Sequence, residues 1–141
     1  MNWVSVAAFD VQGSPKGQPR VKRSRSGGVF TPPIAKEWKE AVILAASKFL
    51  PPKALDCPLR TTIVFFFPRP QRLMSKNSPA GNIPHTTKPD KDNLEKTVLD
   101  ALTEAGMWRD DSIVFSGIVE KYYAAKMQRP GAVIQVFKME V

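Results

Sequence analysis

KPDKDNLEKTVLDALTEAGMWRDD, residues 88–111, places one amphipathic helix between two pairs of aspartates. At about 100° per residue, its apolar positions gather on one face, which predicts a helix over residues 91–105 packed against a core. Gly106 is the type of residue that ends a helix. The core face consists of Leu94, Val98, Ala101, Leu102 and Ala105, and the opposite face of Asp92, Lys96, Asp100 and Thr103.

The segments around this helix predict a mixed sheet. Residues 3–11, 59–67, 112–126 and 132–141 are rich in β-branched and aromatic residues and are expected to be strands. The turn MQRPG predicts that the last two strands form a hairpin. With a second helix over residues 33–50, the order β-α-β-α-β-β predicts an α+β fold, α/β-like in its layers. We expect one domain over residues 1–141, with about four strands and two main helices.

The second helix is bounded by recognisable signals. Thr31 is a candidate cap before it, and Pro51 and Pro52 end it. The three-and-four spacing of its apolar residues predicts one buried face. That face consists of Ile34, Trp38, Ala41, Val42, Ala45 and Phe49.

Two long loops are expected. Residues 12–28 are rich in Gly and Pro, so neither a helix nor a regular strand is expected there. A polar loop runs from residue 68 to about 88, and its length indicates a mobile or functional segment. His85, in this loop, is expected at the surface. Trp3, Trp38 and Trp108 are expected in the core rather than stacked on bases, although Trp108 and Phe30 each lie in an expected loop near a proposed DNA surface.

The composition limits the partners and the compartment. The 141 residues carry 21 Lys and Arg against 13 Asp and Glu, a net charge of +8, which favours nucleic acid ahead of an anionic membrane surface. The single cysteine, Cys57, excludes an intramolecular disulfide and suits a reducing compartment. No signal-peptide pattern opens the chain, and its apolar runs are too short to span a bilayer. The cytoplasm is therefore expected.

The two pairs of aspartates at the ends of the opening stretch admit two interpretations. Taken singly, Asp90 and Asp92 suit a helix cap, adjacent Asp110 and Asp111 suit a turn, and Asp92 with Lys96 suits a surface ion pair. Taken together, their carboxylates are hard ligands that suit Mg²⁺ or Mn²⁺. Mg²⁺ completes its coordination with water and phosphate, so an acidic cluster in a basic protein fits a metal site that receives a phosphodiester.

KPDKDNLEKTVLDAL followed by WRDDSIV resembles the RusA family of Holliday junction resolvases, the crossover junction endodeoxyribonucleases common in phages and prophages. The matched block covers residues 88–123, and GSPKGQPR, residues 13–20, resembles the basic N-terminal loop of that family. The resemblance implies a bacterial or phage protein that acts as a homodimer. It implies that the dimer binds a four-way junction and makes two symmetric cuts with Mg²⁺. The loop over residues 69–89 is longer than a minimal member needs, which leaves the preferred DNA open.

The resemblance also implies roles for individual residues. Asp90, Asp92 and Asp111 match the metal carboxylates, and Lys96 matches the functional lysine. Asp110 is a candidate further ligand, Asn93 a candidate for orienting a carboxylate, and Lys121 matches a recurrent lysine. The DNA contacts are expected from Lys16, Arg20, Lys22, Arg23, Arg25, Lys88 and Lys121.

The expected chemistry is metal-assisted phosphodiester hydrolysis without an organic cofactor. Mg²⁺, or Mn²⁺ in its place, activates a water and stabilises charge on the phosphate. The resemblance implies 5′-phosphate and 3′-hydroxyl ends. One alternative is a non-catalytic nucleic-acid-binding module, whose binding would be indifferent to Mg²⁺. Another is a broader nuclease that cuts flaps or other branched DNA.

Overall fold

The computed structural model describes residues 2–19, 22–30 and 33–140. Its centre is a five-stranded sheet in the order β1-β7-β4-β6-β5. β4 and β6 run parallel, and the other neighbouring strands run antiparallel, so the prediction of a mixed sheet is confirmed. The strands are β1 (Asn2–Gln12), β4 (Leu59–Phe67), β5 (Ile83–Pro84), β6 (Val114–Tyr123) and β7 (Gly131–Glu140).

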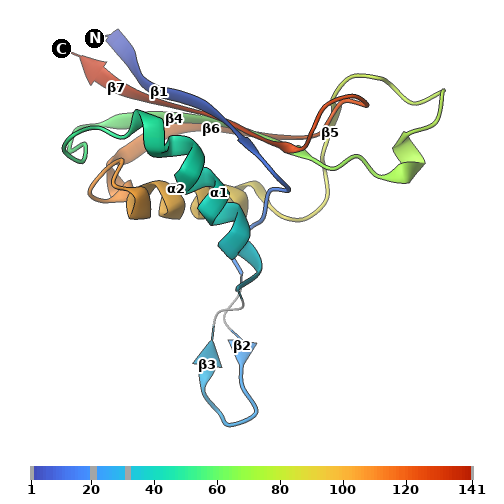
Figure 1. Cartoon of the computed structure of the whole chain (residues 1–141), viewed down its shortest axis with the longest axis horizontal. Coiled ribbons are helices and arrows are strands. Elements are labelled where there is room, and N and C mark those ends of the chain that lie inside the picture. Colours follow the sequence, from blue (N-terminus) through green and yellow to red (C-terminus); the bar gives the residue numbers. More distant parts are fainter. Residues whose placement is uncertain (1, 20–21, 31–32, 141) are drawn as a thin grey trace.

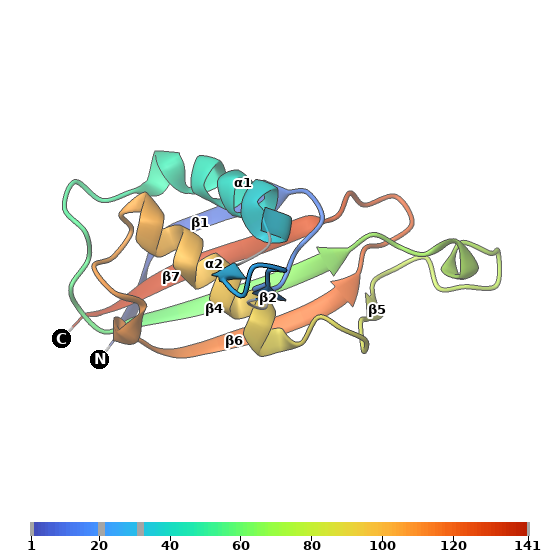
Figure 2. The same cartoon turned by 90° about the horizontal axis from the view of Figure 1, so that it is seen from below.

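Two helices, α1 (Lys36–Ala46) and α2 (Lys91–Ala105), cover the same face of the sheet (Figures 1 and 2). The bounds of α2 are those predicted from its periodicity. Short 3₁₀ turns at Pro33–Ala35 and Ser47–Phe49 flank α1 and together fill the predicted helical span. The core between helices and sheet contains Trp38, Val42 and Ala46 of α1, Leu94, Thr97, Val98, Ala101 and Leu102 of α2, and Ile63, Phe65, Ile134 and Val136 of the strands.

The predicted hairpin of the last two strands is wrong, because β4 lies between β6 and β7. β4, α2 and β6 form a parallel β-α-β unit, and the crossover through α2 brings β6 beside β4. Residues 124–130 then carry the chain past the end of β4 to its other edge. That step spans two strand spacings, about 10 Å, which a connection of this length covers easily. A turn signal in the sequence marks a reversal but does not show which strand lies alongside.

The prediction of the buried face of the second helix is confirmed at the centre of the helix and is wrong at its start. Trp38 and Val42 are fully buried, but Ile34 is 61% exposed. Ile34 lies in the 3₁₀ turn, where three residues make one turn, so the 100° periodicity does not extend to it. Phe49 is partly exposed and stacks on Phe9. The cap predicted at Thr31 lies outside the described residues.

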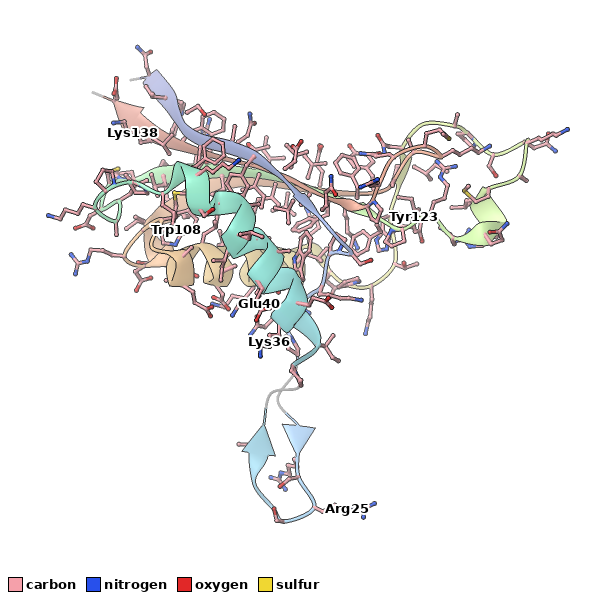
Figure 3. All side chains as sticks on the ribbon, in the orientation of Figure 1. Arg25, Lys36, Glu40, Trp108, Tyr123 and Lys138 are labelled. Atoms are coloured by element: carbon pink, nitrogen blue, oxygen red, sulfur yellow. The ribbon has the colours of Figure 1, made fainter. Side chains whose placement is uncertain are left out.

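Part of the Gly- and Pro-rich stretch folds into a basic ribbon, residues 22–30, which corrects the expectation that no strand persists there. β2 (Lys22–Arg23) pairs antiparallel with β3 (Val29–Phe30). Gly27 supplies the positive φ, +89°, that the tight turn requires. The ribbon projects from the helix side of the molecule, beyond both helices, with Arg25 at its tip (Figures 1 and 3).

The polar loop after β4 is organised by Arg69. Its guanidinium donates to the backbone carbonyls of Leu73, Pro79, Gly81 and Ala124. Lys126 adds a hydrogen bond of 2.6 Å from Nζ to the carbonyl of Ser75. This loop extends from the end of the sheet (Figure 1), and its residues Ile83 and Pro84 form β5 against β6.

The outer face of the sheet carries no helix in the described part of the chain (Figure 1). Trp3 lies on this face, half-buried, so its predicted place in the core is wrong. The guanidinium of Arg60 lies 4.2 Å from its ring centroid, and Phe115 stacks on it at 5.8 Å. Phe115 and Ile118 are more than half exposed there. In the described residues, no helix has the length and apolar character to cross a membrane.

Candidate active site

Asp90 and Asp92 lie at the start of α2, in a segment we call the α2 mouth, residues 88–93. Asp90 is the residue before the first helical turn, and its backbone is extended, with φ −71° and ψ 155°. Its carbonyl accepts the hydrogen bond from the Leu94 N–H at 3.1 Å, but its carboxylate makes no capping hydrogen bond. Both Asp90 and Asp92 are exposed. The helix start therefore leaves the carboxylate of Asp90 available for another ligand.

Lys96 links α2 to the second pair of acids. Its ammonium lies 3.0 Å from Asp100 Oδ1 and 3.7 Å from Asp111 Oδ2. The hydrogen bond and charge of Asp100, followed by the charge of Asp111, raise the pKa of Lys96. The ion pair considered between Asp92 and Lys96 does not form in this structure. The helical spacing permits it, but the chain returning from α2 offers Asp111 and the next turn offers Asp100.

Asp110 and Asp111 are adjacent but have different contacts. Asp110 Oδ1 accepts a hydrogen bond of 2.8 Å from the Ser112 backbone N–H, which caps the 3₁₀ turn Asp111–Ile113. This hydrogen bond lowers the pKa of Asp110. Asp111 instead faces Lys96. The turn interpretation therefore accounts for the contacts of Asp110, whereas the carboxylate of Asp111 lies toward α2.

A pocket of about 380 Å³ opens at the α2 mouth, lined by Gln18, Lys88, Pro89, Asp90 and Asn93. The N-terminal loop closes one side of it, because the Gln18 N–H donates to the Asn93 carbonyl at 3.2 Å. Gly17 packs so closely that a Cβ there would lie 3.1 Å from Pro89 Cβ. Gly17 and Gln18 thus join the N-terminal loop to the acidic segment, although the two are far apart in sequence.

Two residues of the site were not singled out from the sequence. Gln18 places a buried side-chain oxygen, Oε1, beside this pocket without a hydrogen-bond partner in the described residues. Glu95 lies three residues after Asp92 on α2, and burial together with the charge of Asp92 raises the pKa of its carboxyl. Gln18 has no spacing signal in the sequence. Glu95 lies beside the acidic motif, but its helical position alone gives it no role.

The chemistry of these donors fits a divalent cation. The side chains that offer oxygen atoms here are carboxylates and amides, which hard cations prefer as ligands. They belong to Asp90, Asp92, Asn93, Asp111 and Gln18, and Gln18 Oε1 accepts no hydrogen bond from the described residues. Among the described residues, no three His, Cys, Asp or Glu side chains are already grouped closely enough to hold a metal ion. The structure brings Asp111 to Lys96 and Asp90 to Asn93. It does not assemble Asp90, Asp92 and Asp111 as one ligand set.

The predicted DNA-binding cations are distributed over several elements. Arg23 and Arg25 are exposed on the basic ribbon, Lys16 is exposed in the N-terminal loop, and Lys88 is exposed at the α2 mouth. Lys121 lies differently: its Nζ donates to the carbonyls of Thr87 and Pro89. The predictions for Arg20 and for the Lys22 side chain fall outside the described residues.

Of three aromatic residues in expected loops, Trp108 lies in the core, as predicted. Trp108 is 1% exposed, and its Nε1–H donates to Thr103 Oγ1 at 2.7 Å, so it belongs to the core (Figure 3). His85 is 6% exposed and stacks against Phe67, which corrects its expected place at the surface. Phe30 lies in β3, and its side chain is outside the described residues.

The sequence of the chain matches the family model described as endodeoxyribonuclease RusA over residues 11–136. The chain belongs to this family. The matched span includes the Gln18 loop, the α2 mouth, Lys96 and Asp111. A relative in Bacillus subtilis strain 168, described as uncharacterized protein YqaN, is 33% identical over 124 residues, which cover 82% of this chain and 87% of the relative.

Membership of the RusA family establishes the class of reaction. The chain is an endodeoxyribonuclease, and the family resolves Holliday junctions in DNA recombination with a divalent metal. Branched DNA is the substrate class. The alternative of a non-catalytic nucleic-acid-binding module does not agree with this membership.

Proposed function

We propose that this RusA-family chain is a Mg²⁺-dependent resolvase that acts as a homodimer and cuts four-way junctions in symmetric pairs during recombination and repair. The observation that carries the proposal is the arrangement at the α2 mouth. A free carboxylate, that of Asp90, lines a pocket with Lys88 and Asn93, and Lys96 links the next turn of α2 to Asp111. Residues 1–141 form a single catalytic domain in this proposal.

Asp90, Asp92 and Asp111 are the proposed metal ligands. When bound, Mg²⁺, or Mn²⁺ in its place, supplies activation of a water and stabilisation of charge on the scissile phosphate. Asn93 lies in the same pocket as Asp90 and orients the carboxylate. Lys96 holds Asp111 toward α2 and is near enough to the acids to contact the phosphate when DNA is bound. The products carry 5′-phosphate and 3′-hydroxyl ends.

The DNA backbone is held by cations on both sides of this pocket. Lys88 lines the pocket itself, and Lys16 precedes the Gln18 loop that closes it. Arg23 and Arg25 extend the positive surface along the basic ribbon, away from the body. Each such contact with a phosphate adds about 0.9 to the salt dependence of binding to duplex DNA. The ribbon therefore contributes affinity rather than chemistry.

Paired cuts on a two-fold junction require two active sites related by symmetry, which a C2 dimer supplies. The uncovered outer face of the sheet supports this part of the proposal. Phe115, Ile118 and Val133 expose apolar surface there, and exposed patches of this kind mark interaction sites. A second copy of the chain on this face leaves both α2 mouths free for DNA.

The test uses a labelled synthetic four-way junction, a flap substrate and a linear duplex. Wild-type protein and Asp92→Asn are each incubated with them in Mg²⁺ or in EDTA. We expect paired symmetric nicks on the junction alone, which disappear in EDTA and in Asp92→Asn. Because Asp92 is exposed and makes no structural hydrogen bond in the described residues, the variant should fold and bind the junction like the wild type.

Each part of the proposal has its own contrary result. Asp92→Asn that cuts at the wild-type rate removes Asp92 from the site. Equal cutting of flaps and junctions replaces the resolvase with a broader branched-DNA nuclease. Unpaired nicks, together with a monomer in sedimentation analysis, contradict the homodimer.

A further inference from the structure

The side chain of Lys121 reaches from β6 to the segment that leads into the α2 mouth. Its Nζ donates to the Thr87 carbonyl at 2.6 Å and to the Pro89 carbonyl at 2.7 Å. These carbonyls lie three residues and one residue before Asp90. An ammonium group has three donors, so two of the three are committed to the backbone that carries this aspartate.

β6 also holds residues 83–85, which precede Thr87 and Pro89 in the chain. Ile83 and Pro84 pair with Tyr123 and Tyr122, and the His85 N–H donates to the Lys121 carbonyl at 3.0 Å. The His85 ring stacks on Phe67, with 4.0 Å between centroids, and meets the edge of Tyr123 at 4.8 Å. β6 thus fastens residues 83–89 in sequence order, and the Lys121 ammonium makes the last of these contacts before Asp90.

The opposite side of the α2 mouth is closed by the N-terminal loop. Gly17 packs against Pro89 and Asn93, and the Gln18 N–H is bonded to the Asn93 carbonyl. The carboxylate of Asp90 makes no capping hydrogen bond. Its direction is therefore set by its backbone, which is held between Lys121 on one side and the N-terminal loop on the other.

We propose that Lys121 is a positioning residue for the carboxylate of Asp90 and acts through these two carbonyls rather than through a DNA phosphate. The inference rests on the proposed function, in which Asp90 is a metal ligand. Without the ammonium, the carbonyls of Thr87 and Pro89 lose their donor and the backbone before Asp90 can shift. A displacement of about 1 Å at a reacting group can lower a rate by about 10²-fold.

The test is Lys121→Met, which keeps most of the aliphatic stem and removes the donors. At saturating junction, we expect the single-turnover cleavage rate to fall by about tenfold to a hundredfold. The metal concentration for half-maximal cleavage should rise. The junction Kd in EDTA and its salt slope should remain those of the wild type. Lys126→Met is the matched control, because Lys126 also donates to a loop carbonyl, that of Ser75, but away from the α2 mouth.

A chemical rescue separates positioning from a general loss of structure. Cys57 is the only cysteine of the chain, so Cys57→Ser combined with Lys121→Cys leaves one thiol to modify. Alkylation of that thiol with 2-bromoethylamine forms a C–S bond with loss of bromide and restores an ammonium at nearly the lysine position. We expect cleavage to return toward the Cys57→Ser rate after alkylation.

Three results would overturn the inference. A weaker junction Kd and a smaller salt slope with unchanged cleavage at saturation would make Lys121 a phosphate contact. A lower melting temperature of Lys121→Met, without rescue of cleavage by alkylation, would give Lys121 only a stabilising role. Cleavage by Lys121→Met at the wild-type rate would show that Lys121 does not position Asp90. Failure of the proposed function looks different, because Asp90→Asn and Asp92→Asn would then cut normally.

Discussion

The α2 mouth and the basic ribbon both carry side chains expected to meet DNA, but they are held in opposite ways. The α2 mouth is bonded to Gln18 on one side and to Lys121 on the other. The hydrogen bonds of the ribbon's described residues stay within the ribbon, as in the bond from the Ser24 N–H to the Gly28 carbonyl. One region is fixed by the body of the protein, and the other projects from it.

We expect the two regions to have different roles, cleavage for the α2 mouth and binding of the DNA backbone for the ribbon. A cutting site depends on the position of each oxygen, since small displacements cost large factors in rate. Attraction between cations and phosphates extends over about 10 Å at moderate salt and tolerates movement. We therefore expect substitutions of Asp90 and Asp92 at the α2 mouth, and of Asp111, to change cleavage without changing binding. Substitutions on the ribbon should do the reverse.

The largest effect is expected for Asp111→Asn, compared with its neighbour Asp110→Asn. Asp111 faces Lys96 and is a proposed metal ligand, whereas the carboxylate of Asp110 accepts a hydrogen bond from Ser112 N–H. Single-turnover assays should show cleavage reduced by about 100-fold or more for Asp111→Asn. Asp110→Asn should stay close to the wild type, because an amide oxygen can still accept that bond. The reverse ranking would make Asp110 the ligand.

A smaller effect, confined to binding, is expected from Arg23→Gln combined with Arg25→Gln. If each arginine contacts one phosphate, the salt slope of junction binding should fall by about 1.8, at about 0.9 per contact. Cleavage at saturating protein should not change. Lys138→Gln is the control, because Lys138 lies on β7 in the body of the molecule, apart from the ribbon (Figure 3). An unchanged slope would leave the ribbon without a role in holding the backbone.

The sequence predicts best the elements whose residues repeat with a clear period. α2 and β4 have the bounds that their apolar spacing indicates. The largest error, the predicted hairpin, concerns contacts between distant residues. β6 takes its place beside β4 through the crossover of α2, and no turn signal contains that information. The ribbon depends on only two residue pairs, which is too short a run to produce an alternating pattern.

The candidate site shows the same limit. The aspartates and Lys96 are recognisable because their spacing lies within one helix and one turn. Gln18 reaches the pocket only because the N-terminal loop folds onto Asn93. His85 stands in a mostly polar loop of the sequence, but Phe67 packs against it in the structure. Burial of an isolated aromatic residue depends on such partners rather than on its immediate sequence.

Thr103→Val, with Thr103→Ser as control, tests whether the body of the protein depends on its buried hydrogen bonds. Thr103 Oγ1 accepts the hydrogen bond from the buried indole N–H of Trp108 at 2.7 Å, near the chain that returns to Asp111. Valine leaves that N–H without a partner, so the free energy of unfolding should fall by about 1–3 kcal/mol in urea denaturation. Serine keeps the hydroxyl and most of the stability.

On the ribbon, by contrast, Val29→Ala should change the free energy of unfolding by less than about 0.5 kcal/mol. A larger loss would show that the ribbon packs against the body of the protein.

The smallest effect concerns the protonation of His85, which is the only histidine of the chain and is therefore resolved by itself in an NMR titration. Burial lowers its pKa, and the nearby Lys121 ammonium lowers it further. The unfolded chain then takes up the proton at a higher pH than the folded protein does. The contribution of neutral His85 to stability is complete above its unfolded pKa, about 6.5, and is lost as the pH falls through the folded pKa.

His85→Phe keeps an aromatic ring against Phe67 and Tyr123 but does not titrate. Its free energy of unfolding should therefore fall less than that of the wild type as the solution is acidified below about pH 6.5. Lys121→Met removes one cause of the shift and should move the measured His85 pKa upward. A His85 pKa that does not respond to Lys121→Met would place the ammonium farther from the ring than the structure does. The close attachment of residues 83–89 to β6 would then be in question.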